Sequence, residues 1–317
     1  MKRHGSNLRR TAFFRNTTAA LFAAWLSAAS PAGAIVFYAT NNFAYNTTAP
    51  TGALANSGWQ HEGTWSNFLG TAIAPQFFIT AQHVGGNVGE PFTLNSVTYT
   101  TTAVYNDPAS DLAIWKVNTA FPAWASLYTA GGETGAPLVV FGSGLGRGAE
   151  VWADSELKGW KWSGNMVKRW GENVVTGTAN YAGSTLLYAQ FDAGAGANEA
   201  ALAGGDSGGG VFIQQNSTWR LAGINYFVDG PFNTTNTGGG FNASIYDEGG
   251  LYYREDSAWV YVTNQSYNIP ASFYATSISA RQAWIASIIV PEPSGFALMA
   301  AGIAALCAVG RRRARGD

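Results

Sequence analysis

The sequence predicts an all-β protein that ends in one helix. Short runs of β-branched and aromatic residues recur along the chain, separated by Gly, Asn, Pro and Asp. Turn signals about every ten residues between such runs are typical of a β-barrel or a β-sandwich. With 47% hydrophobic and 12% charged residues and no internal repeat, the chain is globular rather than disordered. The runs expected to be strands are FFITA (77–81), SVTYTTTAVY (96–105), DLAIWKV (111–117), PLVVFG (137–142), TLLYAQFD (185–192), GVFIQ (210–214) and WRLAGINYFV (219–228).

The first 34 residues have the pattern of a secretory signal peptide. Five basic residues within positions 1–16 precede an apolar, alanine-rich run from Thr18 to about Ser27. An Ala-Gly-Ala triplet then ends at Ala34 and matches the small-residue motif at which such peptides are removed. We expect export, with a mature chain that begins at Ile35; an amphipathic N-terminal anchor is the alternative interpretation.

The region between the two terminal segments, residues 35–290, is long enough to bury a sizeable core. Within it, the stretch 231–255 is rich in Asn, Thr and Gly and is typical of a long surface loop or insertion. One helix is expected over RQAWIASII (281–289), because apolar side chains share one of its faces. Ser279 and Gln282 have the spacing of a capping box at its start.

The C-terminus, residues 290–317, combines a short motif with an apolar run. VPEP (290–293) precedes an apolar run over 295–310, and four arginines follow from Arg311 on. The run is slightly short for a membrane span, but the basic block behind it is typical of a cytoplasmic stop. This order resembles the PEP-CTERM sorting signal of Gram-negative bacteria. The resemblance implies an exosortase-type partner, transient anchoring in the inner membrane through a transmembrane helix, and release to the cell surface or extracellular matrix.

Charge and cysteine content narrow the possible functions. The whole chain has a formal net charge of −1, but residues 35–290 hold nine basic and 17 acidic residues, a net charge of −8. This argues against nucleic acid as a partner, since nucleic-acid-binding proteins present basic faces. The one cysteine, Cys307, lies in the tail, so the mature region has no disulfide. With two histidines and no cysteine there, no metal site is expected, although calcium on dispersed carboxylates stays open.

Three short blocks carry candidate catalytic groups. ITAQHV places His83 at the end of a strand, DPASDLAIWKV places Asp111 at the head of another, and GGDSGGGVF places Ser207 in a glycine loop. The other mature histidine, His61, lies in a polar stretch and is expected to be solvated. Asp107 is a rival to Asp111. However, Asp107 precedes a proline and is typical of a turn, whereas a charge that opens a buried strand needs a partner.

These blocks resemble the signature blocks of chymotrypsin/trypsin-like serine proteases. They stand in that family's chain order, His, Asp, Ser, which other triad-bearing folds do not share. The resemblance covers roughly residues 55–289, and the last helix resembles the one that closes this fold. It implies two antiparallel six-stranded β-barrels, at 35–125 and 126–289, the second with the closing helix. It also implies a secreted serine endopeptidase that needs no cofactor and acts on protein or peptide substrates.

The chemistry of these residue types agrees with that resemblance. A serine hydroxyl is a poor nucleophile and needs a base that accepts its proton near neutral pH, for which His83 is the candidate. Asp111 would accept the other ring N–H and stabilise the imidazolium as it forms. The backbone N–H groups of Gly205 and Ser207 would form the oxyanion hole.

Substrate preference follows from the pattern of the family. The residue six before the nucleophile lies at the base of its primary pocket, and here that residue is Ala201. Selectivity for Arg or Lys is therefore not expected, and an apolar or small residue before the cleaved bond is the hypothesis. GINYFV (223–228) is expected to pair with the substrate backbone, with Tyr226, Phe227 and Val228 lining the pocket.

Two questions stay open on the sequence alone. In many animal relatives the acid before the nucleophile binds a newly freed Ile-Val amino terminus. Asp206 is the corresponding acid, and cleavage after Ala34 would expose Ile35-Val36; coincidence is the alternative. The second question is whether the chain is catalytic. A non-catalytic surface or extracellular-matrix binding protein on a protease fold is the alternative function, suggested by the sorting tail, the 12 tryptophans and the stretch 231–255.

Overall fold

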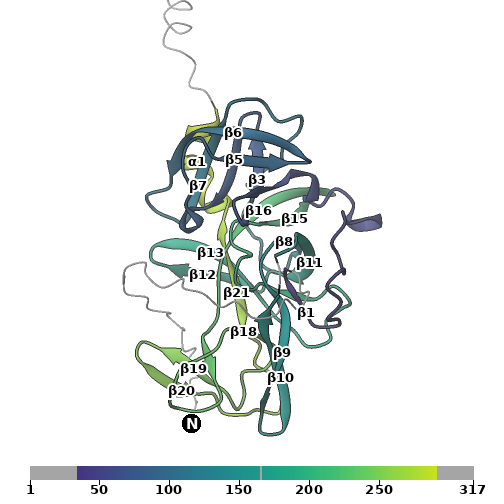
Figure 1. Cartoon of the computed structure of the whole chain (residues 1–317), viewed down its shortest axis with the longest axis vertical. Coiled ribbons are helices and arrows are strands. Elements are labelled where there is room, and N and C mark those ends of the chain that lie inside the picture. The colour runs from purple at the N-terminus through teal and green to yellow at the C-terminus, as the bar shows by residue number, and fades with distance from the viewer. Residues whose placement is uncertain (1–33, 165, 291–317) are drawn as a thin grey trace, which may run out of the picture. The chain divides into compact units, whose positions relative to one another are not determined.

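A computed structural model describes residues 34–164 and 166–290 (Figure 1). The expected signal peptide, apart from Ala34, and the sorting tail beyond Val290 lie outside the described residues, and so does the expected membrane helix. Among the described residues, none of the helices is long and apolar enough to cross a membrane. The described chain is mainly β-structure, as the sequence predicts.

A closed antiparallel barrel of six strands forms first along the chain. Its strands are β2 (Glu62–Trp65), β3 (Phe68–Ala74), β4 (Phe77–Ala81), β5 (Pro91–Leu94), β6 (Val97–Asn106) and β7 (Leu112–Val117). Their order is β2-β3-β4-β7-β6-β5, and β5 pairs with β2 to close the barrel. Aromatic side chains fill the interior, as small barrels require: Phe78 stacks on Phe92 with 3.9 Å between ring centroids, and Trp65 lies 4.6 Å from Trp115. The first expected barrel is confirmed.

The second expected barrel is not confirmed, because seven of the remaining strands form one antiparallel sheet whose end strands do not meet. In spatial order these are β11 (Arg169–Val174), β8 (Pro137–Gly142), β15 (Gly210–Gln215), β16 (Thr218–Val228), β21 (Ser272–Ser277), β13 (Ser184–Gln190) and β12 (Gly177–Tyr181). The end strands β11 and β12 do not pair with each other. On the side of β11 that does not face β8, the Glu172 N–H donates to the Asn198 carbonyl at 2.8 Å. This N–H is therefore not available for pairing with another strand.

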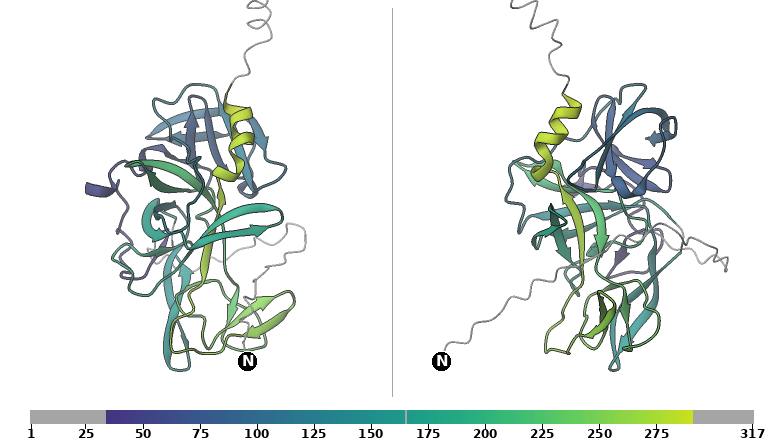
Figure 2. Two further views of the ribbon diagram at one scale, coloured as in Figure 1. Left: turned by 180° about the vertical axis from the view of Figure 1, so that it is seen from behind. Right: turned by 90° about the vertical axis from the view of Figure 1, so that its left-hand side faces the viewer.

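Three smaller sheets complete the β-structure of the described residues. One pairs β1 (Val36–Phe37) with β14 (Ala200–Ala201). The stretch 231–255, expected to be a long surface loop or insertion, is not a loop throughout: it contributes three strands to the other two sheets, and its apolar residues Phe232 and Ile245 are buried in a separate cluster. Figure 2 shows these two other sheets on the far side of the seven-stranded sheet from the barrel. They consist of β18 (Ala243–Ile245), β10 (Glu156–Ser163) and β9 (Gly146–Ala153), and of β17 (Phe232–Asn233), β19 (Tyr252–Glu255) and β20 (Ala258–Tyr261).

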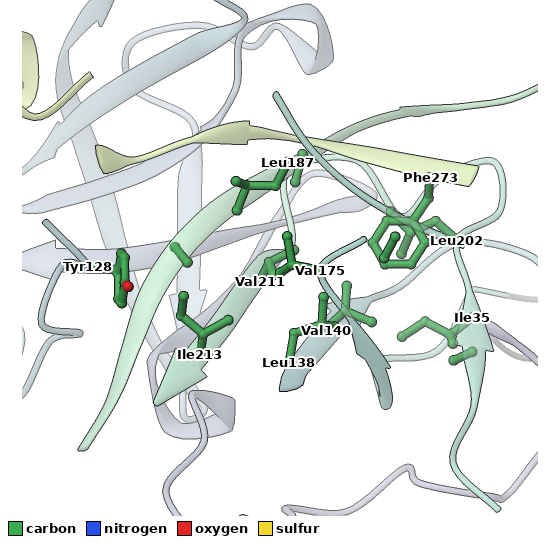
Figure 3. Close-up of a cluster of buried hydrophobic side chains, with 14 of the residues drawn as sticks. Ile35, Tyr128, Leu138, Val140, Val175, Leu187, Leu202, Val211, Ile213 and Phe273 are labelled. Carbon is green, nitrogen blue, oxygen red and sulfur yellow. The ribbon is translucent and has the colours of Figure 1, made fainter. Parts of the chain in front are cut away.

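The seven-stranded sheet buries a hydrophobic cluster against its neighbours (Figure 3). Val140 of β8, Val211 of β15, Leu187 of β13 and Phe273 of β21 belong to it. Successive side chains of a strand point to opposite faces, so alternate apolar residues meet on one side. Ile35, directly before β1, belongs to the same cluster and has no exposed surface. The first residue of the expected mature chain is therefore part of the core.

The described helices are short. Four 3-10 turns, η1 (Gly52–Leu54), η2 (Trp59–His61), η3 (Gln82–Val84) and η4 (Ser279–Arg281), accompany one α-helix, α1 (Gln282–Ile289). The expected C-terminal helix is confirmed, but its expected capping box is not. The N-cap residue is Arg281, without a side-chain cap, and the Ser279 hydroxyl donates to the Glu133 carboxylate. Ser279 lies one 3-10 turn too early to cap α1.

Candidate active site

Three connections bring the side chains of His83, Asp111 and Ser207 together. His83 lies in η3, directly after β4, and Asp111 directly precedes β7, the strand that pairs with β4. The Gln82 N–H donates to the Asp111 carbonyl at 3.0 Å and joins these two strand ends. Ser207 lies in the turn between β14 and β15. The site thus combines two residues of the barrel with one that precedes a strand of the seven-stranded sheet.

The Ser207 turn reaches the barrel because Gly208 has no side chain. A Cβ at this position would lie 2.2 Å from the Thr80 hydroxyl of β4 and 2.4 Å from the Leu69 carbonyl of β3. The glycine also has φ +79°, in the region that other residues rarely adopt. The turn can therefore contact β4, the strand that leads directly to His83.

A continuous line of short contacts links the three side chains. The Asp111 carboxylate lies 2.6 Å from His83 Nδ1, and its other oxygen accepts from the His83 backbone N–H at 2.9 Å. His83 Nε2 lies 2.8 Å from Ser207 Oγ. Because Asp111 can only accept, the Nδ1 proton is assigned to this contact, which leaves the Nε2 lone pair facing the serine hydroxyl. In this arrangement a histidine can take the proton of an attacking serine.

The two other candidates from the sequence have different settings. The Asp107 carboxylate accepts from the backbone N–H two residues on, at 3.0 Å, and from the Ser110 hydroxyl at 2.5 Å, as in a polar turn. Asp111, rather than Asp107, faces His83. His61 was expected to be solvated, but its Nδ1 is buried in η2 and burial lowers the pKa of its ring to about 4. Packing of η2 therefore keeps His61 neutral near pH 7.

Two backbone donors beside Ser207 are not engaged. Within the described residues, neither the Gly205 N–H nor the Ser207 N–H donates to a protein group. Between them, the Asp206 N–H donates to the Ala203 carbonyl at 3.2 Å. Two unengaged donors next to a nucleophile are what an oxyanion hole requires. That role for Gly205 and Ser207 stays a prediction.

Asp206 anchors this loop through a fully buried carboxylate. One of its oxygens accepts from the Gly144 N–H at 2.7 Å, and the other accepts from the Ala203 N–H at 2.8 Å. Burial raises the pKa of Asp206 to about 7; the backbone donors and the charge of Arg169 act in the opposite direction. The carboxyl group therefore changes its charge near neutral pH.

The backbone N–H of Ile35 also faces the Asp206 carboxylate and lowers its pKa. In the continuous chain Ile35 has φ +58°, a left-handed conformation that is strained for a β-branched residue. This torsion involves the peptide bond to Ala34, so cleavage of that bond would remove the strain. The first residue of the expected mature chain thus lies beside the acid that precedes Ser207.

A cavity of about 350 Å³ opens beside Ser207. Tyr226, Phe227 and Val228 of β16 line it, and their contact with substrate stays a prediction. Ala201 does not line it, which corrects its expected place at the base: Ala201 belongs to β14, and pairing with β1 holds it away. Leu202 and Ala203 form part of the wall instead. Lining residues that the sequence did not indicate are Trp162, Asp229, Pro231 and Asn242.

Trp162 and Asn225 are parts of the site that sequence reasoning missed. Trp162 comes from β10, and its indole N–H donates to Ser244 Oγ at 3.0 Å. Asn225 of β16 is buried, and its amide donates to the Phe141 carbonyl at 2.7 Å and to the Asp206 carbonyl at 3.0 Å. It thereby joins β8 to the Ser207 loop. No local signal marks a tryptophan or an asparagine within a strand as part of a site.

Aromatic rings continue from His83 across the sheet. The Tyr226 ring lies 5.7 Å from the His83 ring, Phe227 lies 4.9 Å from Tyr226, and Tyr274 of β21 stacks 4.5 Å from Phe227. A bulge in the pairing of β16 with β21 just before Phe227 lets these two consecutive side chains meet, although regular strands alternate. Burial, and secondly the charge of Asp111, raises the pKa of Tyr226 to about 12, so its phenol stays protonated.

Metal ligands do not cluster within the described ranges, where no group of three or more His, Cys, Asp or Glu side chains is arranged to hold an ion. The absence of a cofactor stays a prediction.

Comparisons with known proteins give weak structural likenesses and no match by sequence. No protein-family model matches the chain, and no curated protein matches it significantly. The chain is similar to two crystal structures of the Rv3671c protease of M. tuberculosis, an inactive form and an inactive serine-to-alanine mutant. Both are 15% identical with a TM-score of 0.42; the likeness covers 76% and 78% of this chain, and 98% and 97% of the others. At these values the likeness does not assign an activity to this chain.

Proposed function

We propose that this chain is a serine endopeptidase that hydrolyses peptide bonds through an acyl-enzyme intermediate. The observation that carries the proposal is the unbroken line of contacts from Asp111 through His83 to Ser207, beside two unengaged backbone N–H groups. Asp111 has only 11% of its side chain exposed, and its carboxylate oxygen lies 2.6 Å from His83 Nδ1, close enough to orient the imidazole ring.

The first half of the reaction forms the acyl-enzyme. Ser207 Oγ attacks the carbonyl carbon of the scissile bond while His83 Nε2 takes its proton. The carbonyl oxygen becomes an oxyanion and accepts hydrogen bonds from the Gly205 and Ser207 N–H groups. His83 then gives its proton to the leaving nitrogen, the C–N bond breaks, and the new amino terminus departs. Asp111 stays ionised throughout and stabilises the imidazolium.

The second half restores the enzyme. A water molecule attacks the ester carbonyl and loses its proton to His83 Nε2, and the same N–H groups hold the oxyanion. The ester C–O bond breaks, and the proton on His83 returns to Ser207 Oγ. The substrate acyl group leaves as a carboxylic acid. The two half-reactions together add one water molecule across the peptide bond and need no electron acceptor or additional group.

An extended peptide fits the edge of β16 as an added strand. The pairing of β15 with β16 ends at Ile224, and Phe227 and Val228 pair only with β21 on their other side within the described residues. A substrate strand on the open side would receive backbone hydrogen bonds there and present alternate side chains to the site. Its cleaved bond would then lie at Ser207.

The cavity favours an apolar residue before the cleaved bond. Trp162, Val228 and Pro231 supply apolar walls. Two aspartates, Asp206 and Asp229, line the cavity. Asp206 already accepts from backbone N–H groups, and Asp229 already accepts from the Ser272 N–H at 2.8 Å and from the Tyr274 hydroxyl at 3.1 Å. We therefore expect a peptide library to be cut after apolar residues. A digest dominated by cuts after Arg or Lys would reject this preference.

Labelling with an organophosphonate tests the proposed function itself. The probe should attach to Ser207 in the folded protein, and Ser207→Ala should abolish both labelling and peptide hydrolysis. Ser257→Ala, in the exposed turn between β19 and β20, is the matched control and should label normally. Absence of labelling in folded wild-type protein would instead favour the non-catalytic binding function.

We propose further that the protein is exported and sorted. The supporting patterns are the leader at 1–34 and the motif, apolar run and arginine block at 290–317. Mass spectrometry of the protein from its native surface fraction should find Ile35 as the first residue and no residues of the apolar run. A chain that retains either segment would contradict the corresponding step.

A further inference from the structure

Two buried charges near the Ser207 loop lack a direct ion partner. Asp206 is 1% exposed and Arg169 is 3% exposed. Asp206 accepts hydrogen bonds from backbone N–H groups. Arg169 donates through Nη2 to the Phe43 carbonyl, and its Nε has no hydrogen-bond partner. Among the ion pairs of the described residues, neither group takes part in one. A buried charge is costly unless a counter-charge compensates it.

The backbone places these two charges beside each other. Arg169 begins β11 and lies directly opposite Gly142 of β8. The Asp206 carboxylate fills the space that a side chain on Gly142 would need, with Oδ1 only 2.1 Å from where a Cβ would stand. Side chains opposite each other in antiparallel strands begin about 4.5–5.5 Å apart. The Arg169 side chain therefore leaves its strand next to the carboxylate.

The other groups that face Asp206 are uncharged in the continuous chain. They are the backbone N–H groups of Ile35 before β1, Gly144 after β8 and Ala203 after β14. Among the described residues, Arg169 is the cation whose field acts on the carboxylate. Each of these two buried charges therefore favours the ionised form of the other.

We propose that Arg169 is a positioning residue for the loop 203–207: its buried charge favours the ionised form of the Asp206 carboxylate, and the ionised carboxylate holds the loop in its shape. An ionised carboxylate accepts from both the Gly144 and the Ala203 N–H groups, whereas a protonated one turns one acceptor into a donor. The loop would then lose an anchor, and the adjoining Gly205 N–H would lose its orientation. The inference rests on the proposed peptidase function, because orientation of this N–H matters only if Ser207 is the nucleophile.

Replacement of Arg169 tests the proposal through kinetics and pH dependence. Arg169→Met should lower kcat about fivefold at pH 7, leave KM within about twofold, and move the acid limb of the kcat profile up by roughly one pH unit. Arg169→Lys keeps the charge and should stay within about threefold of wild type with an unmoved limb. Arg220→Met, a half-buried arginine at the start of β16, is the matched control and should change neither.

A double variant separates a charge effect from a packing effect. If the charge of Arg169 acts through Asp206, Arg169→Met should cost no further kcat in an Asp206→Asn background, where the carboxylate is already neutral. The double variant removes both buried charges together, so it should fold even if the Arg169→Met variant alone does not. Additive losses of kcat in the double variant would overturn the proposal. Equal losses of kcat in Arg169→Met and Arg169→Lys, with the acid limb of the profile unmoved, would overturn it too.

The same variants distinguish this inference from the proposed function. If wild-type protein neither hydrolyses peptides nor reacts with the phosphonate, the peptidase proposal fails. The coupling between Arg169 and Asp206 can still be measured then, as non-additive changes in the urea midpoint of the single and double variants. Additive midpoints would reject the charge pairing on their own.

Discussion

A chain that begins at Ile35 should be more stable and turn over faster than one that begins at Ala34. Both chains carry one free α-amino group, and they differ in where it stands. In the shorter chain it belongs to Ile35 beside the Asp206 carboxylate; in the longer chain it belongs to Ala34, and the carboxylate faces the neutral amide N–H of Ile35. Ile35 and Val36 are fully buried, so a charged amine at this position has no access to bulk water. Its most favourable partner is the carboxylate.

The structure sets the scale of the effect. In the continuous chain, burial raises the pKa of Asp206 from 3.8 to about 7. At about 1.4 kcal/mol for each pKa unit, an ionised Asp206 lowers the free energy of unfolding by roughly 4 kcal/mol above pH 7. Because the folded-state pKa is the higher one, this loss is absent below pH 3.8 and grows as the pH rises to about 7. The left-handed φ of Ile35 adds about 1–2 kcal/mol of strain that cleavage removes.

Urea unfolding and kcat of the two chains between about pH 5 and pH 10 provide the measurement. The chain that begins at Ile35 should gain roughly 2–4 kcal/mol near pH 7, where the amine is protonated and the carboxylate ionised. The gain should disappear toward about pH 10, because an amine whose pKa is raised on folding loses its contribution as the pH passes that value.

Asp206→Asn in both chains is the control, since the amine then has no charge to pair with. It should erase the part of the difference that changes with pH and leave only the roughly 1–2 kcal/mol of relieved strain at Ile35. Equal unfolding free energies and equal kcat in the two wild-type chains across the range would refute the reasoning and leave the position of Ile35 a coincidence of packing.

Three further outcomes follow from the site. Gly205→Ala should lower kcat by about 10²–10³ with little change in KM, because Gly205 has φ +96° and a Cβ there would lie 2.8 Å from Gly144 Cα; unchanged kcat would remove Gly205 from the oxyanion hole. Asn225→Ala should lower the free energy of unfolding by about 1–3 kcal/mol in urea, because two buried carbonyls lose their donor. Phe227→Ala should raise KM for long peptides but not for a short ester substrate, and equal effects on both would contradict a role in binding the extended chain.

Local signals were sufficient to find the three side chains that meet in the site. His83 follows an apolar strand, Asp111 opens another, and Ser207 lies among glycines, so each is marked by its immediate neighbours. Their approach to within 2.8 Å depends on contacts that the sequence does not show, such as that of Gly208 with Thr80. The sequence indicates the candidate groups, and packing of the turn against β4 brings them together.

The errors of the sequence analysis have a common physical origin. Counting residues back from Ser207 placed Ala201 in the pocket, but pairing with Val36 holds it elsewhere. The strands of the second half were recognisable, whereas their closure was not, because closure depends on whether an edge is free and Asn198 occupies part of the edge of β11. His61 looked solvated in a polar stretch, yet packing of η2 buries its Nδ1. Each error concerns a neighbour that is distant in the chain.

The first barrel was implied by the family resemblance, whereas the sequence by itself determined the all-β class, the terminal helix and the three candidate catalytic side chains. These follow from composition, alternation and turn residues, which act over a few positions. Only the tertiary structure decided that Trp162 lines the cavity, that Arg169 and Ile35 lie beside Asp206, and that the second sheet stays open. Burial, electrostatic fields and edge pairing depend on which segments become neighbours in space, and that is settled only when the whole chain has packed.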